Sequence, residues 1–280
     1  MKLKAILASA AATLLVACSG SKENPDARAL MDEATSAFEA ADYNRATSLL
    51  DSLQKAFPGE LTIQREGMTL RPKVIEKLAE IRIASIDSAT IADNATMERI
   101  KPLLKWVKTP GMIEGYWTDA KAYNPSFMNG TGIEARVSEI GQFYIVSSAS
   151  PQLKHTAIAV SGPKGEAATQ AVPYDGESNY RIGGGEVITF SPEQSDTIGV
   201  VADENLSGGA TPLTLKFLGG KAKSLKLSQA QAQGIVNAYR YSQALVRARD
   251  NQVQRQKLEK TIEIARRQLA AQESVAEANQ

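Results

Sequence analysis

The chain has 280 residues, of which 43% are apolar, so it is long enough to bury one large core or two modest ones. Lysine and arginine total 32 against 31 for aspartate and glutamate, and the resulting net charge of +1 argues against a dedicated nucleic-acid binder, which needs a strong basic surplus. The single cysteine excludes a disulfide within one chain.

Residues 1–17 have the layout of a signal peptide, with a basic start, an apolar run too short to span a bilayer, and small residues before Cys18. The tetrad Leu15-Val16-Ala17-Cys18 resembles the lipobox of bacterial lipoproteins. The resemblance implies cleavage before Cys18, lipidation of that cysteine with palmitate-type acyl chains, and residence in the outer membrane, because Ser19 is not the aspartate that retains such proteins in the inner membrane. The resemblance does not indicate whether the protein faces the periplasm or the cell surface. The alternative is an ordinary secretory signal with an incidental cysteine.

Residues 18–26 are polar and contain glycine and proline, which predicts a flexible tether, and a helical region follows over 27–109. Two apolar stripes at helical spacing flank a turn at 42–44. The 34-residue span from 27 to 60 has a small residue at Ala34, Asp42-Tyr43 at the turn, Ala46 in the second helix and Pro58 at its close. In these positions it resembles one tetratricopeptide repeat, although Leu30 replaces the large aromatic of that family. One such unit cannot bury both faces, so the other helices must cover it.

The rest of this region predicts further helices. The segment 61–70 continues in helical style, and Pro72 is expected to open a new helix, because proline suits the first helical turn. A third helix is expected over 93–107, with a kink or restart at Pro102.

Residues 110–227 change to alternating apolar and polar positions with many glycines, which predicts short strands. The expected strands are 133–137, 143–146, 156–160, 180–182, 186–190, 197–201, 213–217 and 222–227. Gly219-Gly220 is a credible hairpin turn. This spacing predicts an antiparallel β-sandwich or open barrel.

Residues 228–272 hold one glycine and no proline, which predicts one long helix followed by a disordered tail over 273–280. Its apolar residues form a narrow stripe that needs a partner helix. We expect it to pack back on the helices of 61–107; a coiled coil between two chains, and hence a homo-oligomer, is the alternative. The fold class is therefore α+β, with N-terminal helical hairpins and a long C-terminal helix flanking the β module.

The sequence contains no strong match to a catalytic, metal-binding or phosphate-binding motif. His155, the only histidine, is interpreted as an exposed or hydrogen-bonding strand residue, and no cluster of histidine or cysteine predicts a metal site. Gly183-Gly184-Gly185 lacks a following helix and is interpreted as a turn, as is Asp203-Glu204-Asn205. We therefore expect no enzyme and no cofactor apart from the covalent lipid.

The one sequence feature that suggests a binding site is an aromatic cluster, which contains both tryptophans of the chain. Its members are Trp106, Tyr116, Trp117, Tyr123 and Phe127. Such rings suit stacking on sugars or docking an extended peptide. The alternative is that they pack into the junction between the helical and β modules and cover its apolar surfaces.

The sequence thus favours a lipid-anchored cell-envelope protein that acts as a non-enzymatic binding or scaffold module for another envelope protein or a peptide. The alternative is a surface lipoprotein that binds or processes glycans through the aromatic cluster. In layout the chain also resembles envelope lipoproteins that have no assigned activity, which adds no site.

Overall fold

The computed structural model describes residues 23–207, 209 and 212–278, so Cys18 lies outside the described residues. The described residues form two compact units, 23–80 with 260–278 and 81–259. Helices α3 (Leu61–Ile100) and α5 (Gln229–Ala278) each contribute to both units. The predicted α+β class, with a long C-terminal helix and antiparallel sheets, is confirmed.

The first unit begins with a helical hairpin, α1 (Pro25–Glu39) and α2 (Tyr43–Ala56). Asn24 caps α1 because its side chain accepts hydrogen bonds from two backbone N–H groups of the first turn, at 2.9 and 3.3 Å. Asp42 caps α2 in the same way, accepting from the N–H of Arg45 at 3.1 Å. These caps fix where each helix starts.

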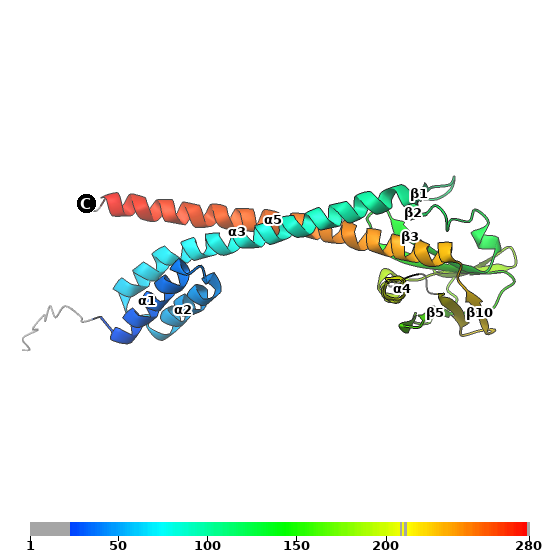
Figure 1. Ribbon diagram of the computed structural model, residues 1–280, viewed down its shortest axis with the longest axis horizontal. Helices are drawn as coiled ribbons and strands as arrows, with labels where there is room; N and C mark the ends of the chain where they lie inside the picture. The colour runs from blue at the N-terminus through cyan, green and yellow to red at the C-terminus, as the bar shows by residue number, and fades with distance from the viewer. Residues whose placement is uncertain (1–22, 208, 210–211, 279–280) are drawn as a thin grey trace, which may run out of the picture. The chain divides into compact units, whose positions relative to one another are not determined.

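The start of α3 covers the apolar face of this hairpin, beside which it lies in Figure 1. The buried residues of the three helices are Ala27, Met31, Ala34, Ala37, Ala46, Leu50, Leu53, Ile63, Leu70 and Val74. Gly67 of α3 faces the leucine side chains of α2, where a Cβ would lie 3.4 Å from Leu53. The expectation that a later helix covers the hairpin is confirmed.

Pro72 lies inside α3, so the prediction that it opens a new helix is wrong. A proline lacks the N–H that would bond to the carbonyl four residues earlier, which is that of Met68. The side chain of Gln272 in α5 donates to this carbonyl instead, at 3.1 Å. The donor from α5 satisfies the carbonyl that the proline leaves unpaired.

The second unit contains two antiparallel sheets. The six-stranded sheet has the order β1 (Leu104–Val107), β2 (Tyr116–Asp119), β3 (Gly132–Ser138), β4 (Phe143–Ala149), β8 (Gly185–Thr189), β7 (Asn179–Ile182). The four-stranded sheet has the order β10 (Lys223–Lys226), β9 (Thr214–Leu218), β5 (Ala157–Gly162), β6 (Gly165–Ala168). Neither sheet closes into a barrel. Short 3₁₀ helices η1 (Lys101–Leu103) and η2 (Phe127–Asn129) lie beside the first sheet.

Two predicted elements of this unit are wrong. The helix expected over 93–107 ends at Ile100, and residues 104–107 form strand β1. The strand expected over 197–201 is part of helix α4 (Pro192–Leu206). Ser191 caps α4, Pro192 occupies its first position, and buried residues recur at helical spacing, so a short apolar run was mistaken for a strand.

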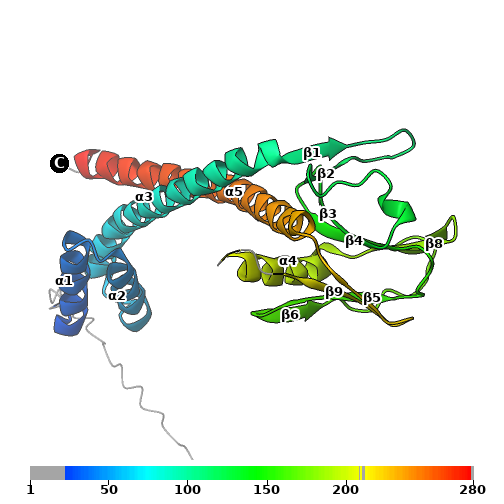
Figure 2. The ribbon, with the colours of Figure 1, turned by 45° about the vertical axis from the view of Figure 1, so that its right-hand side comes forward.

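Helices α4 and α5 share one core with both sheets. In Figures 1 and 2, α4 lies between α5 and the four-stranded sheet. Gly199 of α4 lets the ring of Tyr239 in α5 approach closely, because a Cβ there would overlap that ring. The Tyr239 ring in turn stacks edge-on against Phe143 of β4, with centroids 5.6 Å apart.

Helix α5 pairs with α3 of the same chain. Within the second unit Arg247 contacts Asp93 at 2.7 Å and Arg255 contacts Asp87 at 2.9 Å. Within the first unit Arg266 contacts Glu76 at 2.7 Å. The helix extends to Ala278, whereas the sequence predicted a disordered tail from residue 273.

Candidate binding site

The two tryptophans lie side by side on adjacent strands. Trp106 of β1 and Trp117 of β2 are direct cross-strand partners, so both side chains project from the same face of the sheet. Their ring centroids are 5.0 Å apart and the ring planes are tilted by 53°. A shallow groove of about 360 Å³, which we call the tryptophan groove, is lined by Trp106, Trp117 and Glu139.

Neighbouring groups hold these rings in place. The Lys101 ammonium lies 3.3 Å from the centroid of the Trp117 ring and 3.2 Å from the hydroxyl of Tyr241 in α5. Gly115 lies so close to the Trp106 ring that a Cβ on it would overlap the ring. The N–H of Gly115 donates to the Glu139 carboxylate at 3.4 Å, which ties the rim of the groove to the β1–β2 loop.

The groove carries both a hydrogen-bond acceptor and a donor. The Glu139 side chain is about half exposed, and the ammonium of Lys108 lies 4.0 Å from its carboxylate. Neither group is buried, so both can contact a ligand on the aromatic surface. This combination of rings, acceptor and donor is typical of sites that bind a peptide or a sugar.

Strand β1 is an open edge of the six-stranded sheet, and Figure 2 shows it at the rim. The N–H of Ala120 donates to the carbonyl of Leu103 at 2.9 Å, and hydrogen-bonded pairs alternate along an antiparallel ladder. Lys105 and Val107 are therefore the residues that bond to β2. The N–H and C=O of Trp106 point the other way, toward the open edge beside the groove.

The other predicted aromatics do not join this groove. Tyr116 and Phe127 lie on the opposite face of the sheet, where the guanidinium of Arg136 is 4.0 Å from the Tyr116 ring centroid and 5.8 Å from that of Phe127. Arg136 also bonds to the buried carboxylate of Glu134 at 2.7 Å. Burial raises the pKa of the Tyr116 hydroxyl, so it stays protonated.

Tyr123 follows β2 and lies under the ammonium of Lys105, which is 4.2 Å from its ring centroid. Lys105 belongs to β1 but faces away from the groove, because successive side chains of a strand alternate. The structure therefore divides the predicted cluster of five aromatics into a pair in the groove and three rings outside it.

A buried polar network that the sequence did not predict lies between the two sheets. Ser147 Oγ is 2.7 Å from His155 Nε2, and His155 Nδ1 is 2.6 Å from the Glu186 carboxylate. Ser147 and Glu186 belong to β4 and β8 of one sheet, whereas His155 precedes β5 of the other. The sequence predicted an exposed or hydrogen-bonding strand residue at His155; the side chain is hydrogen-bonded, but it is buried and precedes the strand.

The network has defined protonation. Burial lowers the pKa of His155 below its usual value and outweighs the opposite effect of Glu186. Burial alone would raise the pKa of Glu186, but hydrogen bonds from His155 and the backbone hold that pKa below its usual range. A carboxylate only accepts, so Nδ1 carries the hydrogen and Nε2 accepts from the Ser147 hydroxyl.

The order serine, histidine, glutamate resembles the catalytic set of some hydrolases, but here all three residues are at most 2% exposed. Substrate cannot reach the Ser147 hydroxyl in this arrangement. We therefore assign the network to structure: it joins the two sheets. The only sequence signal for it is that polar Glu186 lies in a predicted apolar strand and polar Ser147 directly follows another, the one predicted over 143–146.

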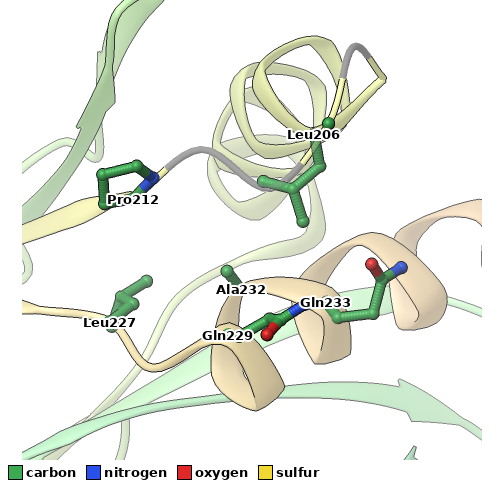
Figure 3. Close-up of a pocket in the computed structure, with 7 residues that line it drawn as sticks. Leu206, Pro212, Leu227, Gln229, Ala232 and Gln233 are labelled. Carbon is green, nitrogen blue, oxygen red and sulfur yellow. The ribbon is translucent and has the colours of Figure 1, made fainter.

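A larger pocket of about 460 Å³ lies between the end of α4 and the start of α5 (Figure 3). Its described lining consists of Leu206, Gly209, Pro212, Leu227, Gln229, Ala232 and Gln233. None of these side chains is charged or titratable, so this part of the wall offers shape without reactive chemistry. We assign it no role.

The glycine run and the acidic triplet considered in the sequence lie outside the groove. Gly183 and Gly184 form the turn between β7 and β8, with positive φ angles of 53° and 81°. Asp203, Glu204 and Asn205 lie in α4, not in a turn. Over the described residues no cluster of three metal-ligating side chains occurs. None of the described helices combines the length and apolar character needed to cross a membrane.

Comparisons of the chain with protein-family models, with curated proteins and with solved structures gave no match.

Proposed function

We propose that this chain is a lipoprotein of the cell envelope, anchored through Cys18, whose folded part binds an extended segment of another envelope protein without catalysing a reaction. The observation that carries the binding proposal is the open edge of β1. There the backbone N–H and C=O of Trp106 face outward, directly beside the tryptophan groove.

An extended segment that adds to β1 would gain two kinds of contact. Its backbone would bond to the outward groups of Trp106, which supplies affinity that does not depend on sequence. One of its side chains would enter the tryptophan groove, which supplies specificity. Because β1 is only four residues long, the backbone contacts alone give weak binding, and the groove has to contribute.

The anchoring part of the proposal rests on the lipobox. Cys18→Ala should abolish incorporation of labelled palmitate and release the protein from the membrane fraction, because no other cysteine can accept the lipid. Retained labelling in this variant would contradict lipidation at Cys18. The binding proposal is tested separately, because it concerns the folded second unit.

Glycan binding is the second candidate, and the specific observation in its favour is the pair of rings beside the Glu139 carboxylate. A sugar ring stacks on tryptophan and donates hydroxyl hydrogens to a carboxylate. A sugar can reach the outward N–H and C=O of Trp106 only through single hydroxyl groups, whereas an extended peptide pairs with both in the geometry of a β ladder. The open edge therefore favours the peptide.

Photo-crosslinking in intact cells tests the binding proposal. Ile113, in the β1–β2 loop, is 92% exposed, so a photoreactive residue fits there without disturbing the core. Ile182, 58% exposed on the opposite edge strand β7, is the matched control. We expect a discrete protein adduct from position 113 and none from 182. Equal labelling from both positions, or no protein adduct from 113, would overturn the proposal.

A further inference from the structure

We infer that the segment bound at β1 is acidic and carries a single aromatic side chain flanked by carboxylates. This inference rests on the proposed binding at the β1 edge and adds the chemical class of the partner. It follows from the charges along the edge and from the direction of each β1 side chain.

Exposed lysines dominate the region around β1. Lys101, Lys105, Lys108 and Lys121 are all exposed. The exposed acids near them are Glu114 and Glu139, and Glu139 lies 4.0 Å from Lys108, so a positive excess remains. Asp119 does not offset them at the surface, because it is 4% exposed and its carboxylate accepts hydrogen bonds from two backbone N–H groups and from Asn237. The edge therefore attracts a segment of negative charge.

The groove face of the edge selects a ring. Cross-strand partners form a row in which Trp106 pairs with Trp117, Trp117 with Val137, and Val137 with Phe143. A strand added to β1 would place one residue opposite Trp106, with Cβ atoms about 5 Å apart, and so would extend this row. An aromatic side chain at that position stacks on Trp106 at the mouth of the groove.

The opposite face selects carboxylates. The residues before and after the ring of the added strand point to the other face, where Lys105 projects from the middle of β1. Lys105 stacks on Tyr123 but remains exposed, so its ammonium can pair with a partner carboxylate without losing the ring contact. The expected pattern is therefore an aromatic residue with an acidic residue on each side.

Intrinsic fluorescence tests this pattern on the purified soluble protein, because both tryptophans of the chain line the groove. The probe is a short blocked peptide that alternates glutamate with valine and has one central phenylalanine. Matched peptides carry lysine in place of every glutamate, or alanine in place of phenylalanine. We expect saturable quenching or a shift with the first peptide, and affinities lower by about tenfold for each matched peptide.

A charge reversal provides the second arm. Lys105→Glu should weaken binding of the acidic peptide about tenfold and strengthen binding of the lysine peptide. The matched control is Lys226→Glu, an exposed lysine on edge strand β10 of the other sheet, which should change neither affinity. Added salt should weaken binding of the acidic peptide, because the paired charges are exposed.

The outcomes separate this inference from the proposed function. Equal or tighter binding of the lysine peptide overturns the acidic class and leaves strand addition in place. A fluorescence response to soluble polysaccharide but to none of the peptides overturns both. An adduct at position 113 together with no peptide response overturns this inference alone, since the partner then docks without an added strand of this pattern.

Discussion

Replacing Glu186 with alanine removes the acceptor at the centre of the buried network. Its carboxylate accepts from the backbone N–H groups of Leu153, Lys154 and His155 at 2.9, 2.9 and 3.2 Å, and from the His155 ring. Each buried donor that loses its acceptor costs about 1 to 3 kcal/mol. Lys154 is exposed, so water can satisfy its N–H. Three buried donors remain, and we expect a total loss of about 3 to 9 kcal/mol. That is a large part of the ~5 to 15 kcal/mol by which proteins are stable.

Urea denaturation followed by tryptophan fluorescence measures this loss, because Trp106 and Trp117 both lie in the second unit. With a denaturant slope of about 2 to 3 kcal/mol per molar, the midpoint should fall by at least about 1 M. The control Glu177→Ala removes an exposed loop glutamate and should change stability by less than about 0.5 kcal/mol. A Glu186→Ala midpoint equal to that of the control would refute our assignment of the network to structure.

Three further predictions concern the second unit. The pKa of His155 lies below its ordinary value of 6.5 in the folded state, so the unfolded chain binds the proton first. The free energy of unfolding therefore falls as the pH drops below about 6.5. Urea midpoints measured from about pH 7 to 5.5 should show this fall in the native chain but not in His155→Gln. Gly115→Ala should displace the Trp106 ring, cost about 1 to 3 kcal/mol and shift the fluorescence emission; an unchanged spectrum would contradict the close approach. Arg247→Ala leaves the buried Asp93 carboxylate without its guanidinium and should cost about 1 kcal/mol by the same denaturation, whereas no change would mean that water replaces the pair.

Local patterns in the sequence predicted much of the fold. Alternation identified β3, short apolar runs identified β4 and β5, and the long proline-free segment identified α5, because these signals arise from neighbours along the chain. Helix α4 was missed although its cap and the spacing of its buried residues are local signals. The error at Pro72 arose where a distant residue decides. Pro72 stays inside α3 because Gln272, two hundred residues later, supplies the missing donor.

The candidate site was predicted only in part, because its geometry also depends on residues that are distant in the sequence. Trp106 and Trp117 could be selected as surface aromatics from the sequence, but their pairing depends on the register of β1, a segment expected to be helical. The separation of Tyr116 from Trp117 could have been predicted, since adjacent strand residues point to opposite faces. The sequence could not have assigned Glu139 to the site, because this residue directly follows β3 and reaches the groove only through the pairing of β3 with β2.

Amide hydrogen exchange at Trp106 tests the central claim most directly. In the free protein this N–H points to the open edge, while Lys105 pairs with Thr118 in the sheet, so the Trp106 amide should exchange much faster than the Lys105 amide. Binding of the acidic peptide, or of the crosslinked partner, should slow exchange at Trp106 and leave Lys105 nearly unchanged. Unaltered exchange at Trp106 in a saturated complex would contradict strand addition at β1.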